Sequence, residues 1–180
     1  MELKIFEILE EQSIIGFSGK LNVLDINTKE QFGYIVFMEG SIVNAKKSNL
    51  MPYKALMNLL LESYNNSHLD FIVEPELVTN ETVSFSLSFE EFKSNGIEYI
   101  NQYEHSKENR PSDSLQLLIK PSFLSQDVEM TKSEYNLLCT LSDFSIVKDV
   151  YENNEMLDYE ITNALISLRK KDALKVVDKK

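Results

Sequence analysis

The sequence is poor in the residues that build disulfides and metal centres. Among its 180 residues it has one cysteine, Cys139, and two histidines, His68 and His105. A lone thiol closes no internal disulfide, which favours a reducing compartment. These three residues show no spacing typical of metal ligands, so the sequence predicts no metal site. Both histidines fall near the ends of predicted elements, where capping or solvation is their ordinary role.

Glycine is also scarce, with five residues in the chain. The sequence holds no Gly-rich loop that could cradle a phosphate, no dinucleotide-binding fingerprint and no Gly-x-Ser-x-Gly elbow. Nothing near Cys139 indicates the electropositive pocket that an activated thiolate needs. The 29 carboxylates can always be paired on paper, so no pair indicates acid–base catalysis. We therefore expect a protein that is not an enzyme and that needs no cofactor.

Long hydrophobic runs are missing as well. The richest apolar stretch, Ala55–Leu61, is interrupted by Asn58 and is far shorter than the ~20 residues of a membrane-spanning helix. The chain begins Met1-Glu2-Leu3-Lys4, without the basic and apolar segments of a signal peptide. The formal net charge is −11, which disfavours binding to nucleic acids and to anionic membranes. We expect a soluble, cytoplasmic protein that does not bind membranes.

What is present begins with the pattern of a β-meander over residues 17–47. Runs rich in β-branched and aromatic residues alternate with polar or glycine-containing connections, such as the Glu39-Gly40 turn. A fourth strand follows later in the chain and is stopped by Pro75. The predicted strands are Gly19–Val23, Phe32–Met38, Ser41–Ala45 and Leu69–Val73.

Helical periodicity predicts helices around this sheet at residues 2–12, 52–63 and 85–105. The second is apolar on almost every side, with Lys54, Asn58 and Glu62 as its polar stripe, so we expect it to be sandwiched. The third is weakened by Gly96. An aromatic stripe gives it a core-facing side formed by Phe85, Phe89, Phe92, Ile100 and Tyr103. The charged stretch Ser106–Asp113, which contains a proline, then predicts a linker.

The C-terminal section is predicted to be helical. Thr131 and Glu134 fit a capping box, in which the hydroxyl and the carboxylate satisfy each other's backbone N–H groups. Cys139 lies within the helix that begins there, and we expect it to be a small hydrophobic residue at the edge of the core. The predicted inward positions of this helix are Tyr135, Leu138 and Leu141.

Two more helices are predicted at Ser145–Tyr151 and at residues 157–171, and a strand follows at Ala173–Val177. Three helices followed by a strand form a winged-helix-like pattern. The inner stripe predicted for the last helix consists of Leu157, Ile161, Ala164, Leu165 and Leu168.

Short motifs follow one another in a fixed order over residues 2–76. They are Gly19-Lys20-Leu21, Gly33–Phe37, Glu39-Gly40, Ile42–Ala45, Ala55-Leu56 and Phe71–Pro75. Their order and spacing resemble the PATAN domain family of bacterial response regulators and stand-alone bacterial proteins. Members often carry a long helix and a winged-helix-like module afterwards. The chain departs from the family pattern at Asn66-Ser67-His68, where a glycine is common, and after Ala45, where Asn49 is the nearest substitute for a glycine.

The predicted fold class is α+β, with an antiparallel β-meander of about four strands packed by helices, a long connecting helix and a small winged-helix-like domain. We place a PATAN-like domain at residues 1–80, the long amphipathic helix and linker at residues 81–110, and the winged-helix-like domain at residues 111–180.

The PATAN resemblance implies a non-catalytic protein-interaction module or adaptor in bacterial signalling or motility regulation. Receiver domains or small GTPases are the partners that the family implies, and homo-oligomer formation is left open. The family carries no catalytic residues. On the last helix, the face opposite the inner stripe gives a candidate interaction surface of Tyr159, Asn163, Ile166 and Lys170. A second, weaker candidate patch consists of Lys46, Lys47 and Tyr53.

The alternative is a DNA-binding transcriptional regulator that acts through the winged-helix-like domain. A helix that reads a DNA groove typically has Arg, Lys, Asn or Gln near its N-terminal end. The last helix instead begins Leu157-Asp158-Tyr159-Glu160. Its cations, Arg169-Lys170-Lys171, lie at the other end, where they complement the helix dipole without any ligand. The charges therefore make DNA binding the second hypothesis.

Overall fold

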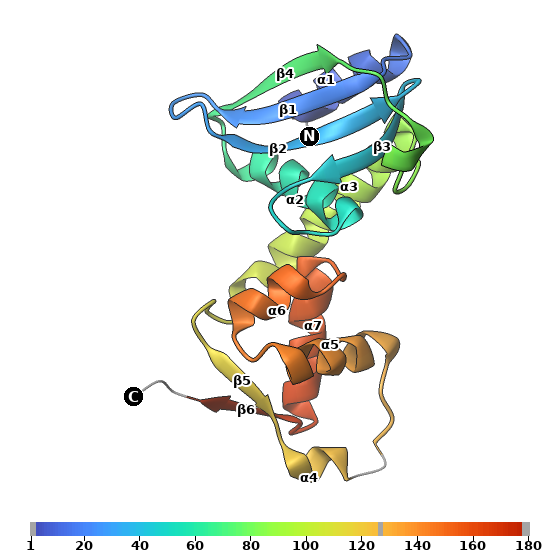
Figure 1. Ribbon diagram of the computed structural model, residues 1–180. Helices are drawn as coiled ribbons and strands as arrows, with labels where there is room; N and C mark the ends of the chain where they lie inside the picture. Colours follow the sequence, from blue (N-terminus) through green and yellow to red (C-terminus); the bar gives the residue numbers. More distant parts are fainter. Residues whose placement is uncertain (1–2, 126–127, 178–180) are drawn as a thin grey trace. The chain divides into compact units, whose positions relative to one another are not determined.

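The computed structural model describes residues 3–125 and 128–177. The chain divides into two compact units, Met1–Ile100 and Asn101–Lys180, and the boundary falls within helix α3, Phe89–Ser106 (Figure 1). Both units contain helices and strands, so the predicted α+β class is confirmed. In the described part of the chain, none of the helices combines the length and the apolar character that crossing a bilayer requires.

Among the described residues of the first unit, four antiparallel strands form one sheet in the order β3-β2-β1-β4 (Figure 1). Glu39 and Gly40 join β2 to β3, and both have positive φ angles, 51° and 80°, as a two-residue type I′ turn requires. The four predicted strands are therefore confirmed. Their bounds are β1 Gly19–Asp25, β2 Gln31–Met38, β3 Ser41–Lys46 and β4 Leu69–Pro75.

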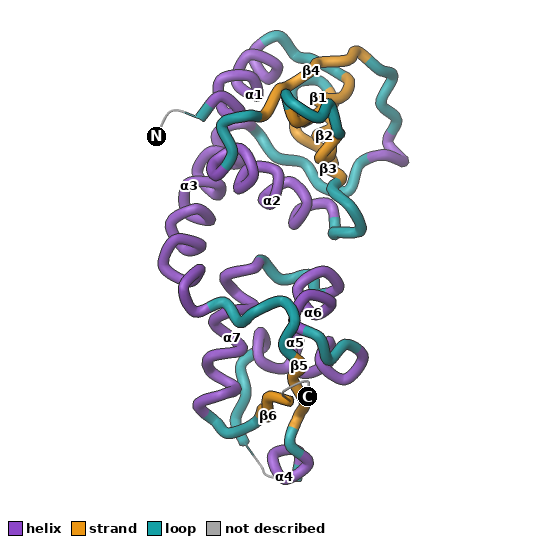
Figure 2. The backbone as a smooth tube through the Cα atoms, turned by 90° about the vertical axis from the view of Figure 1, so that its left-hand side faces the viewer, coloured by secondary structure: helices purple, strands orange, loops and turns teal. Residues whose placement is uncertain are grey.

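Helices α1 (Lys4–Ile14) and α2 (Pro52–Asn65) pack behind this sheet (Figure 2). Strand alternation places one set of side chains toward them, and Leu21, Val23 and Ile35 are fully buried there. The two helices contribute a buried set that packs against these strand residues and includes Ile5, Leu9, Leu56, Leu59 and Leu60. Glu2, the first residue of the predicted N-terminal helix, lies outside the described residues.

Helix α2 is buried on most sides, as its apolar pattern predicted, but its polar stripe does not face solvent. Lys54 is only 3% exposed, because a lysine can bury its aliphatic stem along apolar surface. Asn58 and Glu62 are half-buried, and both accept hydrogen bonds from Nζ of Lys47. The predicted polar stripe is therefore partly buried, and two of its three members bind Lys47.

The predicted start of the third helix at Phe85 is wrong, because α3 begins at Phe89. The N–H of Phe85 donates to the carbonyl of Val43, and Leu87 and Ile42 exchange two hydrogen bonds of 2.9 Å. The segment before α3 is thus extended and covers the outer edge of β3, after the short 3₁₀ helix η1 (Asn80–Thr82). Covering an open edge satisfies its unpaired backbone groups, which spacing alone does not reveal.

Gly96 has a packing role in α3. A Cβ atom at this position would lie 2.6 Å from Cδ2 of Leu60 and 3.5 Å from Cζ of Phe6. The ring of Phe6 also packs edge-on against Phe92, with 5.8 Å between centroids. The glycine that weakens the helix by propensity therefore lets α3 approach α2 and α1 closely.

The second unit combines helices with a two-stranded antiparallel sheet of β5 (Gln116–Ile119) and β6 (Leu174–Val177). Strand β6 follows the last helix as predicted, whereas β5 was not predicted. The predicted linker Ser106–Asp113 contains the end of α3 and the 3₁₀ helix η2 (Lys107–Asn109). The helices of this unit are α4 Pro121–Leu124, α5 Lys132–Asp143, α6 Val147–Asn153 and α7 Asp158–Lys170.

The capping box of α5 is confirmed. Oγ1 of Thr131 accepts from the Glu134 N–H at 3.2 Å, and Oε2 of Glu134 accepts from the Thr131 N–H at 2.7 Å. The inward face was predicted with an error, because Tyr135 is 62% exposed and Leu137 is buried. Cys139 is exposed and does not lie at the core edge. The buried stripe of α5 runs through Glu134, Leu137, Leu138 and Leu141.

Candidate functional site

The residues that could carry metal or thiol chemistry lie apart. Within residues 3–125 and 128–177, no group of three His, Cys, Asp or Glu side chains is placed to hold a metal ion. His68, His105 and Cys139 are exposed and lie on separate elements. Nδ1 of His105 is 2.6 Å from the carbonyl oxygen of Asn101, one turn earlier in α3.

Helix α7 carries the larger candidate interaction surface. Asn163 and Lys170 are exposed, and Tyr159 and Ile166 are half-buried. This strip is opposite the helix face that enters the core of the second unit. The buried residues of that inner face include Ile161, Ala164, Leu165 and Leu168.

The N-terminal end of α7 makes contacts with other residues of the second unit. Oδ2 of Asp158 accepts a hydrogen bond of 2.9 Å from Arg110, whose guanidinium lies 3.9 Å from the centroid of the Tyr151 ring. Burial opposes the charge of Arg110, but the carboxylates of Asp158 and Asp113 raise its pKa above the ordinary value. Burial also raises the pKa of Tyr151 to about 12. Sequence patterns did not reveal this contact, since Arg110 lies far from Asp158 in the chain.

A second buried carboxylate joins α5 to the C-terminal end of α7. Glu134 has a 2%-exposed side chain, and accepts hydrogen bonds from Ser167 at 2.7 Å and Lys171 at 2.8 Å. Burial alone would raise the pKa of Glu134, but these bonds and the Thr131 N–H lower it to about 2. Glu134 therefore holds α7 in place as well as capping α5.

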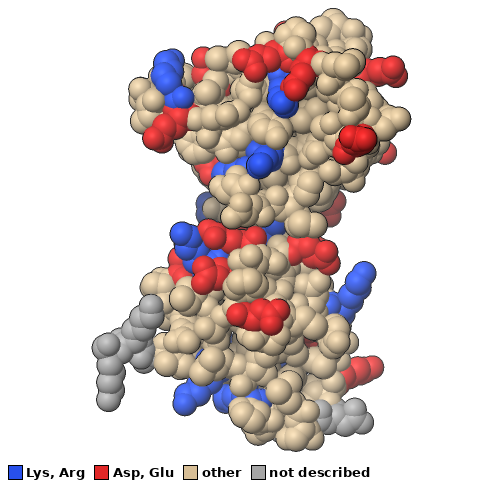
Figure 3. Space-filling view, viewed as in Figure 1, with Lys and Arg blue, Asp and Glu red and all other residues tan. Residues whose placement is uncertain are grey.

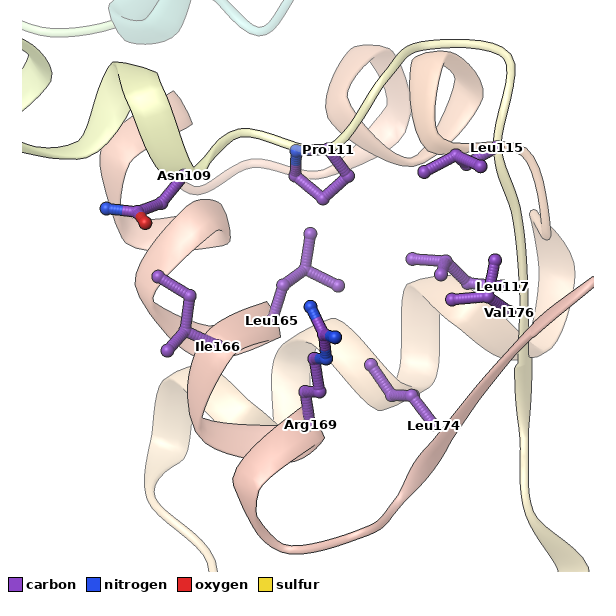
Figure 4. Close-up of a pocket in the computed structure, with 9 residues that line it drawn as sticks. All are labelled: Asn109, Pro111, Leu115, Leu117, Leu165, Ile166, Arg169, Leu174 and Val176. Atoms are coloured by element: carbon purple, nitrogen blue, oxygen red, sulfur yellow. The ribbon is translucent and has the colours of Figure 1, made fainter.

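Between α7 and the β5–β6 sheet lies a cavity of about 140 Å³, which we call the α7–β6 pocket (Figure 4). The pairing of Leu117 with Val176 places both side chains on the sheet face that meets α7. Ile166 is the one predicted surface residue that borders it. The lining residues are Asn109, Pro111, Leu115, Leu117, Leu165, Ile166, Arg169, Leu174 and Val176.

Two polar side chains interrupt the aliphatic wall of the α7–β6 pocket. The guanidinium of Arg169 rises from α7 between Leu165 and Leu174 toward the space beneath Pro111 (Figure 4). Arg169 and Asn109 are exposed, and neither side chain has a hydrogen-bond or ion-pair partner among the described residues. The guanidinium of Arg169 is thus available to a molecule bound in the pocket, whereas the carboxamide of Asn109 points away from the lined space (Figure 4).

The three residues of the second predicted patch do not form one exposed surface. Lys46 is exposed beside a shallow polar hollow that Tyr34 and Asn44 also border. Lys47 instead turns to α2, where its ion pair with Glu62 measures 2.6 Å. The ring of Tyr53 stacks edge-on against Phe85, with 6.0 Å between centroids. Only Lys46 among these three predicted residues presents its charge to solvent.

Sequence reasoning missed most of the α7–β6 pocket because its walls come from three separate segments. The largely aliphatic stretch Leu115–Ile119 could have indicated a strand, but not its pairing with β6. In comparisons with protein-family models, with curated proteins and with solved structures, nothing significantly matches this chain.

Proposed function

We propose that this chain is a non-catalytic protein-interaction module in bacterial signalling or motility regulation. The observation that carries the proposal is the outer strip of α7. There two large side chains, Tyr159 and Ile166, are half-buried between the exposed polar residues Asn163 and Lys170. Aromatic and aliphatic anchors with a polar rim are the usual composition of a protein interface.

The kind of partner comes from the PATAN resemblance of residues 2–76. That resemblance favours receiver domains or small GTPases of signalling circuits as partners. The lone cysteine, Cys139, favours a cytoplasmic location. The strands and the turn that carry the motifs form the four-stranded sheet of the first unit, which is the kind of sheet that the resemblance implies. A second copy of the chain is the competing protein partner.

A DNA-binding role through a winged-helix-like domain is the second candidate. The succession of α6, a short connection at residues 154–157 and α7 favours it, because a recognition helix follows such a turn. The charges oppose it, since Asp158 and Glu160 occupy the end of α7 that would face phosphates. On the face that Figure 3 shows, acidic and basic side chains are interspersed over the described residues.

The test is a pull-down from native cell extract with the double variant Tyr159→Ala/Ile166→Ala. We expect it to keep its fold, judged by circular dichroism, and to lose a partner that the unchanged protein retains at moderate salt. Tyr135→Ala is the matched control, because it removes an exposed aromatic ring from another helix of the same unit. Equal recovery by all three proteins would contradict the proposal, and salt-sensitive recovery of DNA would favour the second candidate.

A further inference from the structure

We propose that the α7–β6 pocket binds a small aliphatic monocarboxylate, with its carboxylate on Arg169 and its hydrocarbon tail inside the pocket. This role goes beyond the protein-interaction function and does not depend on it. It rests on three observations: the apolar walls, the size of the cavity and a cation at its edge that has no partner among the described residues.

The walls of the pocket select an apolar group. Leu117 and Leu165 are buried at 4% exposure, yet Val176 is 47% exposed at the open side. These side chains approach the pocket from β5, α7 and β6, respectively (Figure 4). A molecule that fills the space would remove aliphatic surface of all three elements from water, which favours binding of hydrocarbon.

The size of the pocket selects a short tail. Its volume is about 140 Å³, close to the ~150 Å³ of an engineered apolar cavity that binds benzene, a six-carbon molecule. A hydrocarbon tail of about five or six carbons therefore fits, by that comparison. Acetate leaves the pocket empty, and the end of a much longer acid has to extend into solvent.

The charge at the edge selects the head group. The guanidinium of Arg169 has no partner among the described residues and points toward the lined space (Figure 4). Arg110 in the same unit is instead engaged by Asp158 and Asp113. A planar guanidinium binds a carboxylate through two parallel hydrogen bonds.

The test is a titration of the full-length chain with hexanoate, followed by two-dimensional ¹H–¹⁵N NMR. We expect saturable shifts confined to amides near Leu117, Leu165, Arg169 and Val176. Hexan-1-ol, the uncharged analogue, should bind about tenfold more weakly, because it lacks the charge-assisted bonds. From butanoate to hexanoate, affinity should rise about fourfold per methylene.

Substitutions separate the head-group and tail contributions. Arg169→Gln should weaken hexanoate binding about tenfold, whereas Lys170→Gln, which makes the same charge change next to it, should leave binding nearly unaltered. Val176→Phe should abolish binding of acid and alcohol alike, because the ring fills the open side of the pocket. Unchanged NMR spectra away from the substituted site confirm the fold of each variant.

Several results would overturn the proposal. Absence of saturation by hexanoate at millimolar concentration would reject the site, as would shifts scattered over both units. Equal binding of hexanoate and hexan-1-ol, or equal effects of Arg169→Gln and Lys170→Gln, would reject Arg169 as the carboxylate partner. Binding of a peptide that ends in leucine, without binding of hexanoate, would replace the small molecule by a protein terminus. Loss of the protein complex together with hexanoate binding in these variants would contradict the independence of this site from the proposed interaction.

Discussion

Replacing Glu134 by glutamine should loosen the contact between α5 and α7. The carboxylate is 2% exposed and accepts hydrogen bonds from the Thr131 N–H, the Ser167 hydroxyl and the Lys171 ammonium. Glutamine keeps the size of the side chain but removes its charge. Lys171 would retain the Glu129 carbonyl, 2.8 Å away, as a partner. The variant should therefore fold with a weakened tie between these helices.

The size of the effect follows from the pKa of Glu134, which the folded state lowers from 4.5 to about 2. At 1.36 kcal/mol per pKa unit, this difference corresponds to about 3 kcal/mol. Because the folded pKa is the lower one, the stabilisation is complete above pH 4.5 and disappears as the pH falls toward about 2. Since glutamine keeps part of the hydrogen bonding, we expect Glu134→Gln to cost about 2–3 kcal/mol at neutral pH.

The assay is urea unfolding at a series of pH values, followed through the NMR signals of α5 and α7 amides so that the second unit is observed by itself. The stability difference between the unchanged protein and Glu134→Gln should be constant near neutral pH and shrink below about pH 4.5. Glu152→Gln is the control, because its exposed ion pair with Lys148 spans 3.8 Å and such pairs contribute about 0–1 kcal/mol. Equal losses in both variants, or a Glu134 carboxyl that titrates near its ordinary pKa, would refute the reasoning.

Two further substitutions test the packing of each unit. Gly96→Ala should improve helix propensity but destabilise the first unit by about 1 kcal/mol net, because the new Cβ would meet Leu60 at 2.6 Å; a rise in the urea midpoint would contradict this close approach. Arg110→Lys should destabilise the second unit by about 1–2 kcal/mol through loss of stacking on Tyr151 and of the fork that reaches Asp158; unchanged amide-exchange protection in α7 would contradict that expectation.

Local sequence signals predicted the strands of the first unit and the capping box of α5. The run from Phe32 to Met38 is β-branched and aromatic, and Glu39-Gly40 is able to form the turn that follows it. The side chains of Thr131 and Glu134 each accept a hydrogen bond from the other residue's backbone N–H, within one helical turn. Each of these features depends on residues that are neighbours in the chain, so the sequence pattern is sufficient to predict them.

The errors arose where distant residues decide the structure. Phe85 has helical spacing to Phe89, but the edge of β3 draws its segment into an extended conformation. Tyr135 was predicted inward on one helical face with Leu138 and Leu141. The face that is buried instead includes Glu134, whose partners follow it by 33 and 37 residues. Strand β5 has four residues and finds its partner only at Leu174–Val177, so no local pattern identifies its pairing.

The α7–β6 pocket argues for a role that core packing alone does not explain. The pocket of about 140 Å³ is open on the side of Val176, which is 47% exposed and pairs with Leu117, so its lining side chains lack packing partners there. A larger side chain at Val176 would supply such contacts and raise the stability of the second unit. Incomplete packing beside Arg169, which has no partner in the part of the chain that the structure describes, is typical of binding sites, where function opposes optimal packing. The same valine that leaves the pocket open is therefore the residue whose enlargement should exchange ligand binding for stability.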